Sequence, residues 1–306
     1  MLQRLKKKYS RFWQLYIFLL LPVVYLLIFK YYPMFGLQIA FKKYSIVKGI
    51  FDSPWVGLNN FTRFFNAYQF QTVLKNTLTI SFYAILAAFP FPIIFALILN
   101  TIGNQAVKKT VQTITYIPHF ISTVVLVGMM MQFFNPLAGV YGTIMRAITG
   151  ETPKDIFSIP SAFPHLYVWS GVWQGFGYNS IIYIAALTNV SPELHEAAEV
   201  DGASRFKRVL HIDLPALLPT ITIMLIMRTG AIMSIGFEKD YLMQNSLNLS
   251  RSEIISTFVY KKGLGSGASN DYSYATAIGL FNSVVNLALM VTVNAVCRKL
   301  SETSLW

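Results

Sequence analysis

Long apolar stretches alternate with short polar segments along this 306-residue chain. Residues 12–29, between Arg11 and Lys30, carry no charge, and with their ends they suffice for a helix of about 20 residues that crosses a bilayer. Five further stretches predict membrane spans, at about residues 76–99, 111–134, 163–187, 214–237 and 273–297. Because a polar backbone in lipid must satisfy its own hydrogen bonds, the pattern predicts an all-α integral membrane protein with six transmembrane helices.

Proline, glycine and polar residues mark the connections. Pro90 and Pro92 predict a kink in the second span, because proline removes a backbone donor from the helix. Residues 34–75 read as a long mixed loop whose Trp and Phe side chains predict that it lies on the membrane surface. The Gly- and Ser-rich stretch 263–270 predicts a flexible loop before the last span.

The composition supports a membrane protein, and the distribution of basic residues predicts its orientation in the membrane. Hydrophobic residues make up 54% of the chain and charged residues 12%, against about 25% charged residues in soluble domains. The net charge of +12 includes no long basic stripe with interleaved aromatic residues, so it fits anionic headgroups better than nucleic acid. The basic cluster in residues 1–12 predicts a cytoplasmic N-terminus, and six spans return the C-terminus to the same side.

The sequence contains no catalytic or metal-binding constellation. Cys297 is the only cysteine, which excludes an intrachain disulfide and argues against a cysteine-based metal site. His119 and His165 stand beside prolines near span ends, without acidic or sulfur ligands at metal-binding spacing, and we interpret them as structural. The chain has no Gly-rich phosphate loop, so if ATP drives this protein, another chain binds the nucleotide. We therefore expect the chain not to be an enzyme.

One polar stretch, residues 191–215, has well-defined turn chemistry. Ser191 is a good helix N-cap and Pro192 suits the first helical position. Gly202 stands where a helix would end in a left-handed turn, and an amphipathic run with Phe206 on its apolar face follows. The stretch predicts a helix, a glycine turn and a second helix. Four spans precede it, which places it in the cytoplasm.

The fourth predicted span is both aromatic and polar, and two interpretations stay open. Its small and aromatic residues can pack against neighbouring helices and form an interfacial belt. They can also line a solute path, because aromatic faces stack on sugar rings and amides hydrogen-bond hydroxyl groups; the absence of Lys and Arg near Trp173 then favours a neutral ligand over an anion. Arg228, near the middle of the fifth span, is either a structural residue or a cavity-lining one.

The polar stretch resembles a known motif. It is similar to the EAA loop of permease subunits in binding-protein-dependent ABC importers. The matching pattern is Glu196-Ala197-Ala198, three residues, Gly202, nine residues, Ile212, one residue and Leu214-Pro215. In that family the loop forms coupling helices that dock into a cleft of the ATPase. The resemblance implies that Gly202 forms the turn between them and that Glu196 contacts the ATPase. The residues that it assigns to ATPase coupling are Glu196, Ala197, Ala198, Asp201, Gly202, Arg205, Phe206 and Pro215.

Four other stretches resemble one branch of that family, the LplB/YtcP-like oligosaccharide permeases. They are residues 55–61, 116–122, 236–244 and 304–306, and Asp240 departs from the branch pattern, which has an apolar residue there. The resemblance implies a type I importer permease fold, MetI-like, with cytoplasmic coupling helices. The implied organisation is a cytoplasmic segment 1–12, a first helix and extracellular loop 13–75, a permease domain 76–300 with its coupling loop at 191–215, and a cytoplasmic tail 301–306.

Substrate-path residues follow from the same resemblance. In the related maltose-type permeases the sugar site lies midway through the membrane. Position relative to the EAA loop places parts of the fourth and fifth spans there. The predicted substrate-path residues are Trp173, Gln174, Gly175, Tyr178, Asn179, Arg228, Ser234, Gly236, Phe237 and Glu238.

The resemblance implies partners as well. They are a second homologous permease subunit, two ATP-binding cassette subunits, an extracellular solute-binding lipoprotein, an oligosaccharide substrate and the lipids of a bacterial plasma membrane. This chain would bind no cofactor, since ATP and Mg²⁺ would belong to the ATPases. Two alternatives remain: an ion-coupled secondary carrier, for which the spans lack a row of Asp, Glu and His, and a non-transporting membrane scaffold or sensor.

Overall fold

The computed structural model describes residues 12–265 and 270–301, and this part of the chain consists of helices and connecting turns, with no named β-strand. The all-α prediction is confirmed for these residues. The basic cluster up to Arg11, residues 266–269 of the predicted flexible loop and the tail from residue 302 lie outside them. The α-helices are α2 (Trp13–Leu26), α3 (Gly49–Asp52), α4 (Asn59–Phe65), α5 (Gln69–Ala88), α6 (Pro90–Asn100), α7 (Gln105–Tyr116), α8 (Thr123–Phe133), α9 (Val140–Thr149), α10 (Phe163–Asn179), α11 (Ile181–Leu187), α12 (Pro192–Val200), α13 (Arg205–Arg208), α14 (Leu214–Gly230), α15 (Phe237–Met243), α16 (Leu249–Ser252), α17 (Ile255–Gly263) and α18 (Tyr272–Ser301).

The chain divides into two compact units, of which the first comprises residues 1–65 and 261–280. Its first helix does not end at Lys30 as predicted. α2 continues through a π turn and a 3₁₀ turn, so the helical run extends from Trp13 to Phe41. Pro33 does not stop it, because this proline lies in the first turn of the 3₁₀ segment, where its missing N–H costs no hydrogen bond. Residues predicted as loop therefore hold the end of this run, α3 and α4.

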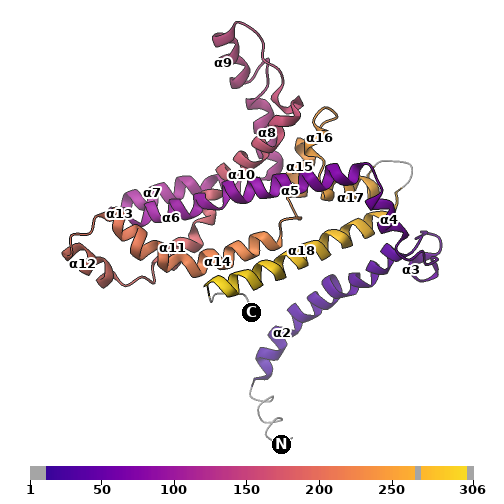
Figure 1. Ribbon diagram of the computed structural model, residues 1–306, viewed down its shortest axis with the longest axis horizontal. Coiled ribbons are helices and arrows are strands. Elements are labelled where there is room, and N and C mark those ends of the chain that lie inside the picture. Colours follow the sequence, from indigo (N-terminus) through magenta and orange to yellow (C-terminus); the bar gives the residue numbers. More distant parts are fainter. Residues whose placement is uncertain (1–11, 266–269, 302–306) are drawn as a thin grey trace, which may run out of the picture. The chain divides into compact units, whose positions relative to one another are not determined.

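The second unit, residues 66–260 and 281–306, holds the larger core. α5 and α6 form one helical run, Gln69–Asn100, that is interrupted only at Phe89. Pro90 and Pro92 occupy the first turn of α6, where a proline is tolerated. α10 packs against α5 and α6, and α11 packs against α6 and α14 (Figure 1). The buried apolar core includes Ile80, Leu126, Val127, Phe163, Val168, Val172, Met243 and Ile254.

The third predicted span, 111–134, is not one straight helix. The run Gln105–Phe120 and the helix Thr123–Phe133 meet at 95°. Pro118 lies in the 3₁₀ turn that ends the first run, and the hydroxyl of Ser122 caps α8 by accepting from the amide of Val125 at 3.3 Å. The bend turns α8 away from the layer of long helices, and α9 follows beyond it (Figure 1).

The fifth predicted span, 214–237, is wrong at both ends. Its helical run begins at Arg205, because α13 and a π turn lead directly into α14, and it stops at Gly230. Arg228 consequently lies in the last turn of α14 and not near the middle of a span. Residues 231–236 are not helical, and the chain resumes as the short helix α15.

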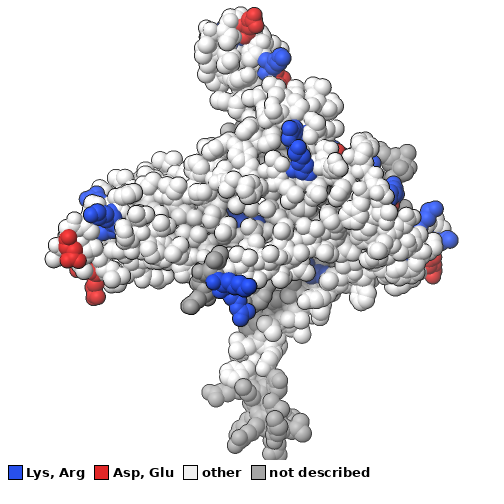
Figure 2. All heavy atoms as spheres, in the orientation of Figure 1, with Lys and Arg blue, Asp and Glu red and all other residues white. Residues whose placement is uncertain are grey.

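The fourth and sixth predicted spans differ in continuity. Residues 163–187 are divided by Ser180 into α10 and α11, whereas the last predicted span is one helix, α18. In the described part of the chain, four helical runs are long and apolar enough to cross a membrane, and the bent α7–α8 pair is a fifth candidate. On the face seen in Figure 2, acidic and basic side chains gather at the end formed by α12 and α13, whereas the helix flanks are largely uncharged.

Candidate substrate cavity and coupling segment

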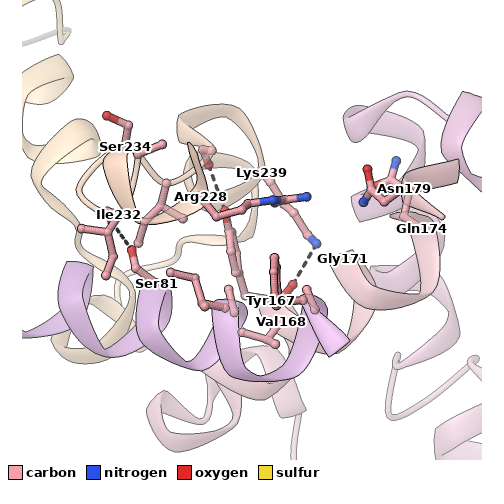
Figure 3. A pocket seen from close by; sticks show the side chains of 17 residues that line it. Ser81, Tyr167, Val168, Gly171, Gln174, Asn179, Arg228, Ile232, Ser234 and Lys239 are labelled. Carbon is pink, nitrogen blue, oxygen red and sulfur yellow. Dashed lines mark hydrogen bonds between the residues drawn. The ribbon is translucent and has the colours of Figure 1, made fainter. Parts of the chain in front are cut away.

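A cavity of about 330 Å³ lies in the second unit, between α5, α10, the end of α14 and the segment that leads to α15 (Figure 3). This volume is at the lower end of the range of ligand pockets, roughly 300–1,000 Å³. Two helices contribute residues at helical spacing, so that one face of each lines the cavity. These residues are Ser81, Ala84, Ile85 and Ala88 from α5, and Tyr167, Val168, Gly171 and Gln174 from α10.

Residues 231–236, here called the unwound segment, form another wall of the cavity. Non-helical backbone at membrane depth must find partners outside its own helix. Asn286 of α18 provides one, because its Oδ1 accepts from the Met233 amide at 2.9 Å, and its Nδ2 also donates to the side-chain Oγ of Ser234 at 2.8 Å. Ser81 Oγ of α5 donates to the carbonyl oxygen of Ile232. Side chains from two other helices therefore hold the segment open.

Two basic side chains reach the cavity, one from each side of the unwound segment (Figure 3). Arg228 extends from the last turn of α14. Lys239 extends from α15, and its Nζ donates to the carbonyl oxygen of Tyr167 at 2.8 Å. A Cβ added at Gly171 would lie 3.4 Å from this Nζ, in ordinary van der Waals contact with the ammonium group.

The segment formed by α12, its turn and α13, here called the coupling segment, has the local structure that its sequence predicts. Ser191 Oγ accepts from the amide of Glu193 at 3.3 Å and caps α12, which begins at Pro192. Gly202 has φ 76°, in the left-handed region. The Ala203 amide donates to the carbonyl oxygen of Ala198 at 2.8 Å, and the Gly202 amide donates to that of Glu199 at 3.0 Å. This pair of bonds is the Schellman motif that ends a helix at glycine.

Asp213 contacts both the coupling segment and the end of α6. It is 2% exposed. Its Oδ1 lies 3.2 Å from His195 Nε2 of α12 and accepts from Asn100 Nδ2, at the end of α6, at 3.2 Å. A hollow of about 540 Å³ adjoins this cluster, and Glu196 and Arg205 are among the residues that line it.

A comparison with protein families identifies the chain. Residues 88–302 match the family described as binding-protein-dependent transport system inner membrane component. The chain belongs to this family. It is an inner membrane component whose fold is the all-helical, MetI-like permease fold.

Relatives of this permease component include sugar transporters. It is 41% identical over 292 residues to Protein LplB of Bacillus subtilis (strain 168), with 95% of this chain and 91% of the relative covered. It is 38% identical to the polygalacturonan/rhamnogalacturonan transport system permease protein YteP of the same organism, with 95% and 90% covered. A bacterial alginate ABC transporter, crystallised in complex with alginate pentasaccharide-bound periplasmic protein, contains a chain that matches with a TM-score of 0.89 and 37% identity, with 99% of this chain and 100% of that chain covered.

The structure of this permease component brings some predicted substrate-path residues together and leaves others apart. Those that line the cavity are Gln174, Asn179, Arg228, Ser234 and Gly236. Those that do not are Trp173, Gly175, Tyr178, Phe237 and Glu238. Helical geometry explains the difference on α10, because Trp173 lies about 100° around the axis from Gln174 and is 46% exposed.

Tyr178 is engaged elsewhere. Its ring stacks on His119 with the centroids 3.7 Å apart and the planes 3° from parallel. His165 also has a partner outside the cavity, since its Nδ1 lies 2.9 Å from Tyr83 Oη. Both histidines thus have the side-chain contacts that a structural role requires.

The predicted coupling residues lie together on an exposed part of this permease component. Glu196 and Arg205 line the hollow beside Asp213. Ala198 lines a second, smaller recess next to the glycine turn. Phe206 is 75% exposed. The remaining members, Ala197, Asp201 and Pro215, are exposed as well.

Sequence reasoning missed three polar residues of the cavity, Ser81, Tyr167 and Lys239. Ser81 and Tyr167 carry no local signal, because an isolated Ser or Tyr is common in membrane helices. Lys239 did carry one. A lysine near the end of an apolar stretch is expected at the interface, and here the unwound segment turns it back toward α10.

Proposed function

We propose that this chain is a permease subunit that imports an oligosaccharide across the plasma membrane of a bacterium by alternating access, driven by ATPases that are separate chains. Membership of the family and the names of the sugar-transporting relatives support the substrate class. The six proposed spans are the run that starts with α2, α5 with α6, α7 with α8, α10 with α11, α14, and α18. Both termini then lie in the cytoplasm.

The observation that carries the proposal is the continuous helical run Arg205–Gly230. It begins at the glycine turn of the coupling segment and ends at the unwound segment, with Arg228 in the wall of the cavity. At 1.5 Å per residue, its 26 residues span about 39 Å. A displacement of the coupling segment by an ATPase would therefore be transmitted directly to the cavity.

Exposed apolar side chains support the coupling segment as the ATPase contact. Phe206 is 75% exposed, Val200 89% and Leu194 55%, although the segment is otherwise polar. Apolar groups of this size on a polar protrusion mark a protein interface. In the proposed assembly, Glu196 contacts the ATPase and Gly202 forms the turn. ATP and Mg²⁺ bind to the two ATPase subunits, and this chain binds no cofactor.

The assembly also includes a second homologous permease and an extracellular solute-binding lipoprotein. The matching alginate transporter chain, which was crystallised with a periplasmic protein, supports the second of these partners. We propose that the second permease closes the cavity. Binding of ATP would bring the ATPases together, draw the coupling segments inward and open the cavity toward the binding protein.

Uptake into proteoliposomes tests this function against its alternatives. The chain is reconstituted with its partner permease and ATPases, and the uptake of labelled oligosaccharides is measured with the binding protein outside. We expect uptake that requires ATP inside. Uptake driven by an ion gradient without ATPases would identify a secondary carrier instead. If neither saccharide uptake nor stimulated ATP hydrolysis occurs, the chain is a scaffold.

A further inference from the structure

The charge of the cavity is the feature that the proposed function leaves unexplained. Arg228 and Lys239 are both basic, and none of the described residues that line the cavity is acidic. No described residue accepts a hydrogen bond from the Arg228 guanidinium group, and no described carboxylate forms an ion pair with it. A guanidinium group has five donors in a planar fork, so this side chain presents unused donors to the cavity.

Lys239 is held in place by Tyr167. Its ammonium group donates to the Tyr167 carbonyl oxygen at 2.8 Å and lies 4.9 Å from the centroid of the Tyr167 ring. An ammonium group has three donors, so further N–H groups remain for a ligand.

The two acids that flank Lys239 do not line the cavity. Asp240 follows Lys239 on α15, but it is buried, and its Oδ2 accepts from Gln244 Nε2 at 2.8 Å. Glu238 is exposed, and neither acid lines the cavity. Two basic side chains in a cavity whose described lining contains no acid attract an anion.

We propose that the cavity binds the carboxylate of a uronic acid unit in the oligosaccharide, with Arg228 and Lys239 as its two ligands. This inference rests on the proposed function and names the substrate class of the same cavity. The planar fork of Arg228 matches a carboxylate in bidentate geometry, and Lys239 adds a point charge. The amides of Gln174 and Asn179, which also line the cavity, supply hydrogen bonds for the sugar hydroxyls. The expectation of a neutral ligand, drawn from the neighbours of Trp173, considered only one helix.

The test compares two probes that differ in charge. The probes are α-1,4-linked trigalacturonate and its fully methyl-esterified form, which has the same rings and no carboxylate. Equilibrium binding is measured on the full chain assembled with its partner permease and ATPases in lipid nanodiscs, without the binding protein. The loss of one charged hydrogen bond weakens binding by about tenfold or more. We therefore expect trigalacturonate to bind at least about tenfold more tightly than the ester.

Variants locate the effect. Arg228→Gln and Lys239→Gln should each weaken trigalacturonate binding about tenfold or more and leave the weak binding of the ester within about twofold. Arg228→Lys should restore part of the affinity, because it keeps the charge and loses the fork. Lys75→Gln is the matched control, because Lys75 is exposed on α5 and does not line the cavity. It should change neither affinity.

The outcomes separate the two proposals. Equal or tighter binding of the ester, or equal losses for both probes in Arg228→Gln and Lys239→Gln, would overturn the carboxylate site. So would the absence of binding in nanodiscs when ATP-driven uptake of either saccharide occurs with the binding protein present; importer function would then stand. Absence of uptake of every saccharide tested would overturn the proposed function and this inference together.

Discussion

Replacement of Gly202 measures how strongly energy coupling depends on the turn of the coupling segment. Gly202 has φ 76°, and an added Cβ would meet no atom within 4 Å. Alanine at this position therefore causes no clash and costs only the left-handed backbone, about 1–2 kcal/mol. Such a cost lowers the ratio of the correct turn to other conformations by a factor of about 5–30, which is the upper limit of the effect on uptake. We expect Gly202→Ala to reduce ATP-driven uptake by up to this factor.

Asparagine is the matched control, because it is larger than alanine and yet tolerates the left-handed region. We expect Gly202→Asn to retain most of the uptake. Hydrogen exchange provides the structural measurement, since the Gly202 and Ala203 amides donate the two bonds of the turn and should exchange faster in Gly202→Ala. If Asn and Ala reduced uptake equally, side-chain volume at the ATPase contact would matter and the backbone argument would be refuted. Full uptake by Gly202→Ala would remove the turn from the coupling mechanism.

Three further substitutions test the packing and the polar contacts of the second unit. A Cβ at Gly177 would lie 2.3 Å from the Thr115 carbonyl oxygen, so Gly177→Ala should destabilise the chain by about 1–3 kcal/mol and lower its melting temperature in detergent. Gly128→Ala, where no atom lies within 4 Å, should not lower it. Asp213→Ala removes a buried hydrogen-bond acceptor at a cost of about 1–3 kcal/mol in stability. We expect the complex to assemble and to transport less saccharide per ATP hydrolysed. An unchanged ratio of transport to ATP hydrolysis would show that Asp213 has no part in energy coupling. Asn286→Leu keeps the branched shape of the side chain and removes both bonds to the unwound segment, so hydrogen exchange of residues 231–236 should accelerate. Unchanged exchange would show that other contacts hold the segment.

The features that depend on residues close together in the chain could be predicted from the sequence alone. The helical class follows from the apolar stretches, because only helices satisfy the backbone within the lengths available. The cap at Ser191 and the turn at Gly202 were predicted at the correct residues, since each depends on bonds between residues at most five positions apart. The EAA resemblance could be identified for the same reason, because all of its residues lie within one short segment.

The ends of the helices and the lining of the cavity were decided by tertiary structure. The apolar pattern continues past Gly230, yet the helix stops there, and the unwound segment is held by Asn286, 53 residues from Met233, and by Ser81, 151 residues from Ile232. No window of local sequence contains both partners of such bonds. The same unwinding brings Lys239 beside Tyr167 and Arg228 into the same cavity. The sequence by itself determined a membrane-embedded helical permease. Only the folded chain decided that two basic side chains line its cavity, because α10 and the unwound segment that place them are held by residues distant in sequence.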